Sequence, residues 1–303
     1  MDGIVIINKP KHQTSHDIVR KAKKILNEKV GHTGTLDPNA TGVLPLLIGK
    51  GTELSKYLIN HDKTYEAILQ LGEKRDTGDV EGKIIEQKNV TEKSLNTENI
   101  NSVFKTLIGK QEQIPPIYSA LKVNGKRMCD LVRSGRADEI NLKTRPVYIK
   151  ELNILSIRDN KIMFYVKCSK GTYVRSICYD VGKVLGCGGH MSFLLRTSSG
   201  KFNLENGITL EELKEYNDNN TLDKYLYDID YVLTNFNKIK IHENAEKYYI
   251  NGGIIDERRF IEKDFNENDE FVRVYSSKEF IGIGKIIRKN NTISVKSDKL
   301  FIV

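Results

Sequence analysis

The chain has 303 residues, 39% of them hydrophobic and 29% charged, which predicts a folded protein with one sizeable core and a second small domain. No stretch approaches the roughly 18 apolar residues of a membrane span, and the first residues lack a signal peptide's apolar run, so the cytoplasm is the expected location. The formal net charge of +8 favours an anionic partner without identifying it, because many basic proteins bind no nucleic acid.

The first two predicted elements are a short buried strand and an amphipathic helix. Residues 3–8 (GIVIIN) have the pattern of a strand that ends at Lys9-Pro10, since proline cannot donate to a β-ladder. In residues 15–29, apolar side chains recur at helical spacing, and Ser15 is the expected N-cap.

A second pair of patterns occupies the middle of the chain. Residues 63–72 alternate apolar and polar side chains, which predicts a strand with Tyr65 on its covered face. Residues 162–186 change from strand period to helical period around Gly171, so Arg175 falls near the junction. The predicted apolar stripe of this helix consists of Ile177, Val181, Val184 and Leu185.

The composition changes again at residues 214–238, where asparagine-rich runs predict a domain boundary. Beyond it, short strand candidates separated by polar turns predict a small β-barrel or sandwich. These candidates are residues 271–277, 280–287, 292–296 and 300–303. We therefore divide the chain into a large domain, residues 1–235, and a small β-rich domain, residues 236–303.

The cysteines do not predict a disulfide framework or a four-cysteine zinc site, because they lie far apart without a CxxC pair. We expect all of them to be small buried residues; they are Cys129, Cys168, Cys178 and Cys187. His190 lies three residues after Cys187, but the irregular spacing favours a structural histidine over a metal ligand.

The acidic run at residues 76–82 matches two known motifs, but the residues around it do not fit either of them. Asp76-Thr77-Gly78 is the tripeptide of aspartic proteases, but its flanks are charged and turn-like rather than apolar strands. The run also resembles a calcium loop, but Gly78 and Val80 occupy ligand positions and no glutamate closes the loop in register. Neither activity is predicted.

Residues 31–45, GHTGTLDPNATGVLP, contain a single acidic side chain, Asp37, among glycines and prolines that force turns. Taken alone, Asp37-Pro38 fits an ordinary turn equally well. The whole stretch, however, resembles the catalytic loop of the bacterial tRNA pseudouridine-55 synthases, the TruB family, position by position. The resemblance continues through residues 3–10, 63–72, 76–82, 115–127, 168–182 and 186–202.

This resemblance implies an α+β fold: a mixed, largely antiparallel sheet with flanking helices and a central cleft, followed by a small PUA-like RNA-binding domain. It also implies an isomerase that converts uridine 55 in the T-loop of tRNA to pseudouridine by base flipping. The implied partner is the T-arm stem-loop of tRNA. A monomer is expected, with no obligate protein partner and no membrane.

The resemblance assigns roles to individual residues. Asp37 matches the essential aspartate, Tyr65 the tyrosine that stacks on the target base, and Arg175 the arginine that pairs with the aspartate. His32 matches the histidine that fills the space left by the flipped nucleotide, and Leu194 lines the pocket. The other implied substrate-binding residues are Lys9, Tyr173, Arg196 and, in an RNA-clamping insert at about residues 113–147, Lys122, Lys126 and Arg127.

The reaction explains why one carboxylate suffices. Breaking the bond between N1 and the ribose and rejoining through C5 involves no oxidation or hydrolysis, so no cofactor or metal is required. A buried aspartate stays ionised only beside a cation, a role for Arg175. The sequence leaves open whether Asp37 attacks ribose C1′, adds to the base, or removes a ribose proton.

Two other functions compete with this interpretation. A non-catalytic RNA-binding or RNA-folding protein fits the charge equally well, but it would not need Asp37, Tyr65 and Arg175 together. A zinc nuclease or deaminase lacks the required H-x-E and P-C-x-x-C pairing.

Overall fold

The structure, a computed structural model, describes residues 1–58, 61–289 and 292–302. Its residues cluster into two compact units: residues 6–46 with 58–222, and residues 1–5 and 47–57 with 223–303. The smaller unit thus includes two short segments from the N-terminal part of the chain. The domain boundary at residues 235/236 stays a prediction.

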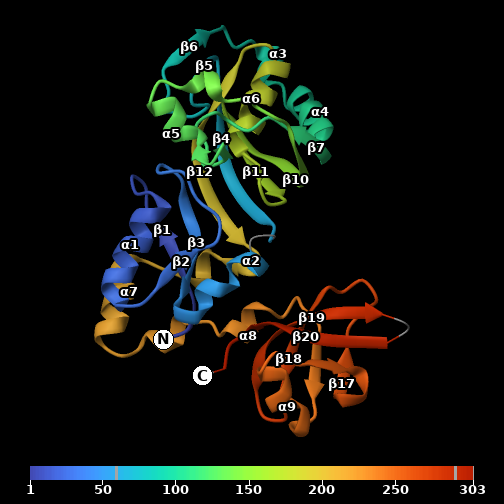
Figure 1. Ribbon diagram of the computed structural model, residues 1–303. Coiled ribbons are helices and arrows are strands. Elements are labelled where there is room, and N and C mark those ends of the chain that lie inside the picture. Colours follow the sequence, from blue (N-terminus) through green and yellow to red (C-terminus); the bar gives the residue numbers. More distant parts are fainter. Residues whose placement is uncertain (59–60, 290–291, 303) are drawn as a thin grey trace. The chain divides into compact units, whose positions relative to one another are not determined.

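The helices and strands are labelled in Figure 1. Up to residue 168 they are β1 (Gly3–Lys9), α1 (Ser15–Leu26), β2 (Val30–His32), β3 (Thr41–Ile48), α2 (Ser55–Leu58), β4 (Lys63–Leu71), β5 (Glu73–Arg75), β6 (Ile84–Gln87), α3 (Glu92–Leu95), α4 (Thr97–Leu107), β7 (Gly109–Gln113), β8 (Lys122–Val123), β9 (Lys126–Arg127), α5 (Met128–Arg133), β10 (Arg145–Arg158) and β11 (Lys161–Cys168). The later elements are α6 (Val174–Val184), β12 (Gly189–Ser199), β13 (Phe202–Asn203), β14 (Gly207–Ile208), α7 (Leu210–Asp218), α8 (Ile229–Val232), β15 (Lys238–Ile241), α9 (Glu243–Ile250), β16 (Ile254–Asp256), β17 (Phe260–Asp264), β18 (Phe271–Tyr275), β19 (Phe280–Lys289) and β20 (Thr292–Leu300).

The large sheet has the order β14-β1-β3-β12-β4-β11-β10-β7. Strand β4 is antiparallel to both β11 and β12, whereas β12 pairs with β3 in parallel. The predicted alternation in β4 is confirmed, since Tyr65, Ala67, Leu69 and Leu71 are all buried. The prediction of an α+β fold with a mixed, largely antiparallel sheet is therefore confirmed.

Helix α1 begins one residue earlier than predicted. Its N-cap is Thr14, which forms a capping box with Asp17, so the prediction that Ser15 caps the helix was wrong. The Ser15 side chain is instead buried, and its hydroxyl exchanges hydrogen bonds of 2.9 and 3.2 Å with the backbone of Leu36. This contact fixes the loop that carries Asp37.

Helix α6 packs on β12 through small residues rather than through the complete predicted apolar stripe. Ile177 and Val181 are buried as expected, but Val184 is 65% exposed. The reason is the close approach at Gly182, where a β-carbon would lie 2.4 Å from the backbone nitrogen of Gly189. The helix therefore meets the sheet along this face, and Val184 projects away from it.

The small unit contains a six-stranded sheet of order β16-β20-β19-β18-β15-β17, with α9 packed against β16 and β20 (Figure 1). Its buried core comes from these elements: Ile239, Ile241, Ala245, Tyr249, Ile255, Val272, Val274, Ile281, Ile286 and Val295. The strands predicted at 271–277, 280–287 and 292–296 are confirmed. The one predicted at 300–303 was wrong: Leu300 ends β20, residues 301–302 form no strand, and Val303 lies outside the described residues.

The cysteines are unpaired, and three of them are buried as expected; Cys129 is only half-buried. His190 is buried, with Nδ1 3.2 Å from the carbonyl oxygen of Glu73, as expected of a structural histidine. Across residues 1–58, 61–289 and 292–302, no group of three potential metal ligands comes together. Among these same residues, no helix is sufficiently long and apolar to cross a membrane.

Candidate active site

The loop between β2 and β3 carries Asp37, and the side chain of Lys9 is hydrogen-bonded to it. The Lys9 side chain is buried, and its ammonium group donates to the carbonyl oxygens of Pro10, Gln13 and Pro38 at 2.8, 2.7 and 3.0 Å. The backbone nitrogen of Ala40 also donates to the carbonyl oxygen of Asp37 at 3.0 Å. Together with Ser15, these bonds make the loop rigid.

The start of β3, directly after this loop, lies against β12 at Gly42. This residue has φ +103°, and a β-carbon there would lie 2.2 Å from the carbonyl oxygen of Arg196. Only glycine allows this approach without displacing a strand. The glycine thus sets how close Asp37 comes to the centre of the sheet.

Asp37 and Arg175 form a two-pronged ion pair. Nε of Arg175 lies 3.0 Å from Oδ2 of Asp37, and Nη2 lies 3.1 Å from Oδ1. The arginine side chain is 5% exposed and that of the aspartate 35%, so the cation is inside the protein while the carboxylate reaches the surface. The resemblance implied this pair, and the structure brings both residues together.

The remaining nitrogen groups of Arg175 are satisfied by residues that the sequence did not single out for this role. Nη1 donates to the carbonyl oxygen of Thr77 at 3.2 Å and lies 3.6 Å from Oδ2 of Asp79, while Nη2 also donates to the carbonyl oxygen of Tyr118 at 3.0 Å. The acidic run that resembled a protease or calcium motif is thus the segment that holds Arg175. The only sign of this role in the sequence was that residues 76–82 take part in the resemblance to the TruB family.

The surroundings of Asp37 change the balance between its charged and neutral forms. Burial raises the pKa of the carboxyl above its ordinary value, and the negative charge of Asp79 raises it further. The positive charges of Arg175 and Lys9 act in the opposite direction. The ion pair with Arg175 therefore favours the ionised form of Asp37, which burial disfavours.

Tyr65 and Arg196 occupy directly opposed positions on β4 and β12. Burial raises the pKa of the Tyr65 phenol to about 12, although the positive charge of Arg196 counteracts the rise. Arg196 is completely buried, and it donates through Nε to the carbonyl oxygen of Val43 and through Nη2 to that of Gly34. Arg196 therefore links the loop that carries Asp37 to the strand beside Tyr65.

His32 ends β2, and its Nδ1 is buried without a hydrogen-bond partner among the described residues. Burial lowers the pKa of His32, and the nearby charges of Arg196 and His16 lower it further. These surroundings therefore favour the neutral imidazole.

The other implied residues lie in different surroundings. Leu194 is 7% exposed on β12. Tyr173 directly precedes α6, and its burial raises the pKa of its phenol, on which the charges of Arg175 and Asp37 have opposite effects. Lys9 and Arg196 are buried against loop backbone. Their assignment to substrate binding stays a prediction.

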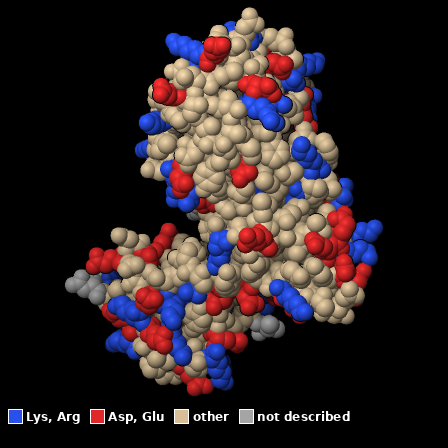
Figure 2. All heavy atoms as spheres, turned by 180° about the vertical axis from the view of Figure 1, so that it is seen from behind, with Lys and Arg blue, Asp and Glu red and all other residues tan. Residues whose placement is uncertain are grey.

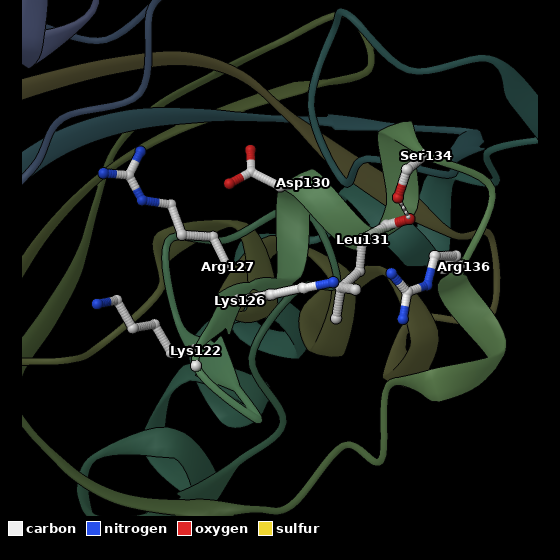
Figure 3. A pocket seen from close by; sticks show the side chains of 8 residues that line it. Lys122, Lys126, Arg127, Asp130, Leu131, Ser134 and Arg136 are labelled. Atoms are coloured by element: carbon white, nitrogen blue, oxygen red, sulfur yellow. Dashed lines mark hydrogen bonds between the residues drawn. The ribbon is translucent and has the colours of Figure 1, made fainter.

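The three cations of the insert line a separate open pocket of about 590 Å³. Lys122, Lys126 and Arg127 are exposed side chains on the hairpin β8-β9, as Figure 3 shows. The pocket is completed by Gly125, Asp130, Leu131, Ser134 and Arg136. Arg136 pairs with Glu139, whereas the part of the chain that the structure describes offers no ion-pair partner to Lys122 or Arg127.

Positive and negative side chains are interspersed over the six-stranded unit in Figure 2. Several of them form ion pairs within it, among them Lys238–Glu262, Lys263–Glu257 and Lys285–Glu270. This pairing reduces the field that the unit presents to an anionic partner.

The mixed sheet and the aspartate held by a buried arginine are those expected of a pseudouridine synthase, and the similarity to known proteins shows that the chain belongs to this class. The chain belongs to the TruB family: it matches the TruB family pseudouridylate synthase N-terminal domain over residues 22–174. It also matches the tRNA pseudouridylate synthase B C-terminal domain over residues 175–234.

Individual relatives agree with this assignment. The chain is 61% identical over 303 residues to the tRNA pseudouridine synthase B of Clostridioides difficile (strain 630), with 100% of both chains covered. It is 45% identical to that of Clostridium acetobutylicum, covering 94% of this chain and 96% of the relative. A chain in the crystal structure of a Cbf5-Nop10-Gar1 complex is similar with a TM-score of 0.77 and 28% identity, covering 99% of this chain and 85% of that one.

The position of Asp79 predicts a change in pH dependence. In Asp79→Asn, we expect the acidic limb of the single-turnover rate to move to lower pH, because a charge that raises the pKa of Asp37 is removed. The plateau rate should change by less than about tenfold, because Arg175 keeps its hydrogen bonds to the carbonyl oxygens of Thr77 and Tyr118. Rates of isomerisation measured from pH 4 to 9 provide the test.

Asp76→Asn is the matched control, because Asp76 lies in the same loop but accepts a hydrogen bond from the backbone nitrogen of Lys83. Its acidic limb should coincide with that of the wild type. A limb that stays in place in Asp79→Asn, or moves to higher pH, would contradict the electrostatic role of Asp79.

Proposed function

We propose that this protein isomerises uridine 55 in the T-loop of tRNA to pseudouridine. The observation that carries the proposal is the Asp37 carboxylate held by two nitrogens of Arg175 at 3.0 and 3.1 Å, with part of its surface open to a substrate. A protein that only bound RNA would gain nothing from a buried arginine beside a partly exposed aspartate, because burying a charge is costly. The relatives named tRNA pseudouridine synthase B support tRNA as the substrate.

Base flipping accounts for two further residues. A uridine inside a folded loop has to leave its stack before a carboxylate reaches it, at a cost of a few kcal/mol. We assign the neutral, planar His32 to the space that the nucleotide vacates. Tyr65 then stacks on the flipped base, an interaction that is worth about 1 to 3 kcal/mol, while Leu194 lines the pocket.

The reaction requires a base after the ring is rejoined. The new bond to C5 leaves a proton on that carbon, and the proton has to depart before pseudouridine is released. We propose that the phenol oxygen of Tyr65 takes part in this transfer. With a pKa of about 12, which already includes the effect of Arg196, it is a neutral phenol in the free enzyme. It therefore passes its own proton to a bridging water as it takes the proton from C5, and the positive charge of Arg196 favours the phenolate character that this transfer needs.

The insert supplies the electrostatic part of binding in this proposal. Lys122, Lys126 and Arg127 lie on one hairpin, and exposed cations at this spacing attract a phosphate backbone by releasing its counterions. Because the six-stranded unit contains opposite charges in similar measure, we assign most of the salt dependence to the insert.

We propose further that the enzyme acts as a monomer in the cytoplasm and needs no cofactor. The isomerisation exchanges one bond of uracil for another, so neither electrons nor a phosphoryl group has to be supplied. The T-arm stem-loop of tRNA is the proposed binding partner.

The direct test of the function is the variant Asp37→Asn. The amide keeps the shape of the side chain but is a poor nucleophile and a poor base, so we expect pseudouridine formation to be abolished. Binding of a T-arm hairpin should stay within several-fold of the wild type. Release of tritium from 5-³H-uridine measures the reaction, and fluorescence anisotropy measures the affinity.

Asp159→Asn provides the control, since it makes the same carboxylate-to-amide change at the exposed turn between β10 and β11. It should react at the wild-type rate. If Asp37→Asn still formed pseudouridine, the carboxylate would have no role in the mechanism.

Tyr65→Phe separates stacking from proton transfer. Phenylalanine keeps the aromatic face, so the affinity for RNA should be unchanged, whereas loss of a general base should slow turnover by about 100- to 10,000-fold. Rapid quenching should then reveal RNA in which the original glycosidic bond is broken but pseudouridine has not been released. Tyr65→Leu should also lose affinity. Turnover of Tyr65→Phe near the wild-type rate would assign the proton to another base.

Charge reversal tests the clamp. In the double variant Lys126→Glu and Arg127→Glu, the slope of log Kd against log salt should decrease by about one unit for each phosphate group that the protein no longer neutralises. The double variant Arg158→Glu and Lys161→Glu is the matched control, because these exposed residues face each other at the β10-β11 turn. Equal slopes in the two double variants would place the phosphate-binding cations elsewhere.

A further inference from the structure

The last residue of β7 makes an unusual contact with the start of α6. Gln113 is 6% exposed, and its Oε1 accepts a hydrogen bond of 2.7 Å from the backbone nitrogen of Tyr173. Its Nε2 donates to the carbonyl oxygen of the same residue at 3.1 Å. One side chain therefore satisfies both backbone groups of Tyr173, as a neighbouring strand would.

This contact holds the backbone of the residue at which α6 begins. Tyr173 is the N-cap residue of α6, and no side chain caps the helix from that position. The Tyr173 carbonyl oxygen also accepts bonds from the backbone nitrogens of Ser176 and Ile177 at 3.1 and 3.3 Å, which define the first turn. Gln113 is thus the side chain that fixes this turn from outside the helix, and Arg175 is the second residue of the helix.

Two more hydrogen bonds join the same turn to the segment after β7. The hydroxyl of Ser176 donates to the carbonyl oxygen of Ile114 at 2.8 Å, and Nη2 of Arg175 donates to that of Tyr118 at 3.0 Å. Three successive contacts therefore connect the first turn of α6 with residues 113–118. This segment is the root of the insert.

The residues that directly follow the root, 119–121, are in turn bonded to the helix that follows the clamp hairpin. The backbone nitrogen of Met128 donates to the carbonyl oxygen of Leu121 at 2.7 Å, and that of Cys129 donates to Ser119 at 3.1 Å. Met128 begins α5 and is buried. A bonded path thus runs from the cationic hairpin through the root to Arg175.

We propose that Gln113 is a positioning residue for pseudouridine formation: it holds the first turn of α6 against the root of the insert, so that Arg175 meets both oxygens of Asp37. The inference rests on the proposed function. Nη2 of Arg175 is shared between Tyr118 and Asp37, so a displacement of the root or of the turn changes the contact with Asp37. Gln113 touches no substrate itself and acts through Arg175.

Gln113→Leu removes both hydrogen bonds while keeping a buried side chain of similar size. We expect the single-turnover rate to fall by about 10- to 100-fold, because a displacement of about 1 Å at a catalytic group has such an effect. The Kd for a T-arm hairpin should stay near the wild-type value, since the residue is buried. The acidic limb of the rate should move to higher pH, because Arg175 opposes the rise in the pKa of Asp37 while Asp79 and Lys9 are unchanged.

The matched control is Gln111→Leu, the same change two residues earlier on β7. Gln111 donates to the carbonyl oxygen of Thr106 at 3.1 Å, away from α6, and its loss should leave the rate and its pH dependence unaltered. If Gln113→Leu unfolds, Gln113→Asn keeps the donor and the acceptor on a side chain that is one methylene shorter, and it adds no charge to the site. This variant should show a smaller loss of rate.

Three measurements decide the outcome: the thermal unfolding midpoint, the Kd by anisotropy, and tritium release between pH 4 and 9. A slower rate with a shifted acidic limb and an unchanged Kd would support the positioning role. If the Gln113 variants matched Gln111→Leu in rate and limb, or lost only affinity, that role would be refuted. An inactive wild-type protein, by contrast, would refute the proposed function.

Discussion

The buried guanidinium of Arg175 is the constraint on which the active site depends. A charge removed from water is stable only if it is paired and its N–H groups are bonded. Arg175 meets this requirement with a carboxylate from the β2-β3 loop, a carbonyl oxygen from the acidic run and another from the insert root. Three segments far apart in the chain therefore have to converge, and the same contacts that satisfy the cation orient Asp37.

The scaffold supports this arrangement from the opposite side. Lys9 and Ser15 bond the backbone of the Asp37 loop, and Gly42 lets the start of β3, directly after that loop, approach β12. Because Lys9 and Ser15 bond the backbone of the loop, they hold the carboxylate without using its oxygens, which stay available to Arg175 and to a substrate. Preorganisation of this kind lowers the reorganisation that the reaction requires.

At Asp37, the burial that shields the carboxylate from water also disfavours its ionised form. Burial and Asp79 favour the neutral acid, whereas Arg175 and Lys9 favour the carboxylate. A more exposed aspartate would ionise without help but would interact with a flipped base in water, where charges are screened. The ion pair thus permits an ionised group in a partly dry site. It also makes the reactivity of that group depend on the position of α6.

Local pattern determined a large part of the architecture. Period-2 alternation predicted that Tyr65 is buried, and the change of period near Gly171 placed Arg175 at a strand-to-helix junction. The glycines and prolines around Asp37 required a loop. These features could be predicted because each of them depends only on residues that are close together in the sequence. The tertiary structure decided the rest. The Ser15 hydroxyl turned inward to Leu36, Val184 projected outward because Gly182 met the sheet, and Gln113 reached the backbone of Tyr173. These outcomes depend on which segments meet across large sequence separations, and a buried polar group takes its partner from whichever segment packs beside it.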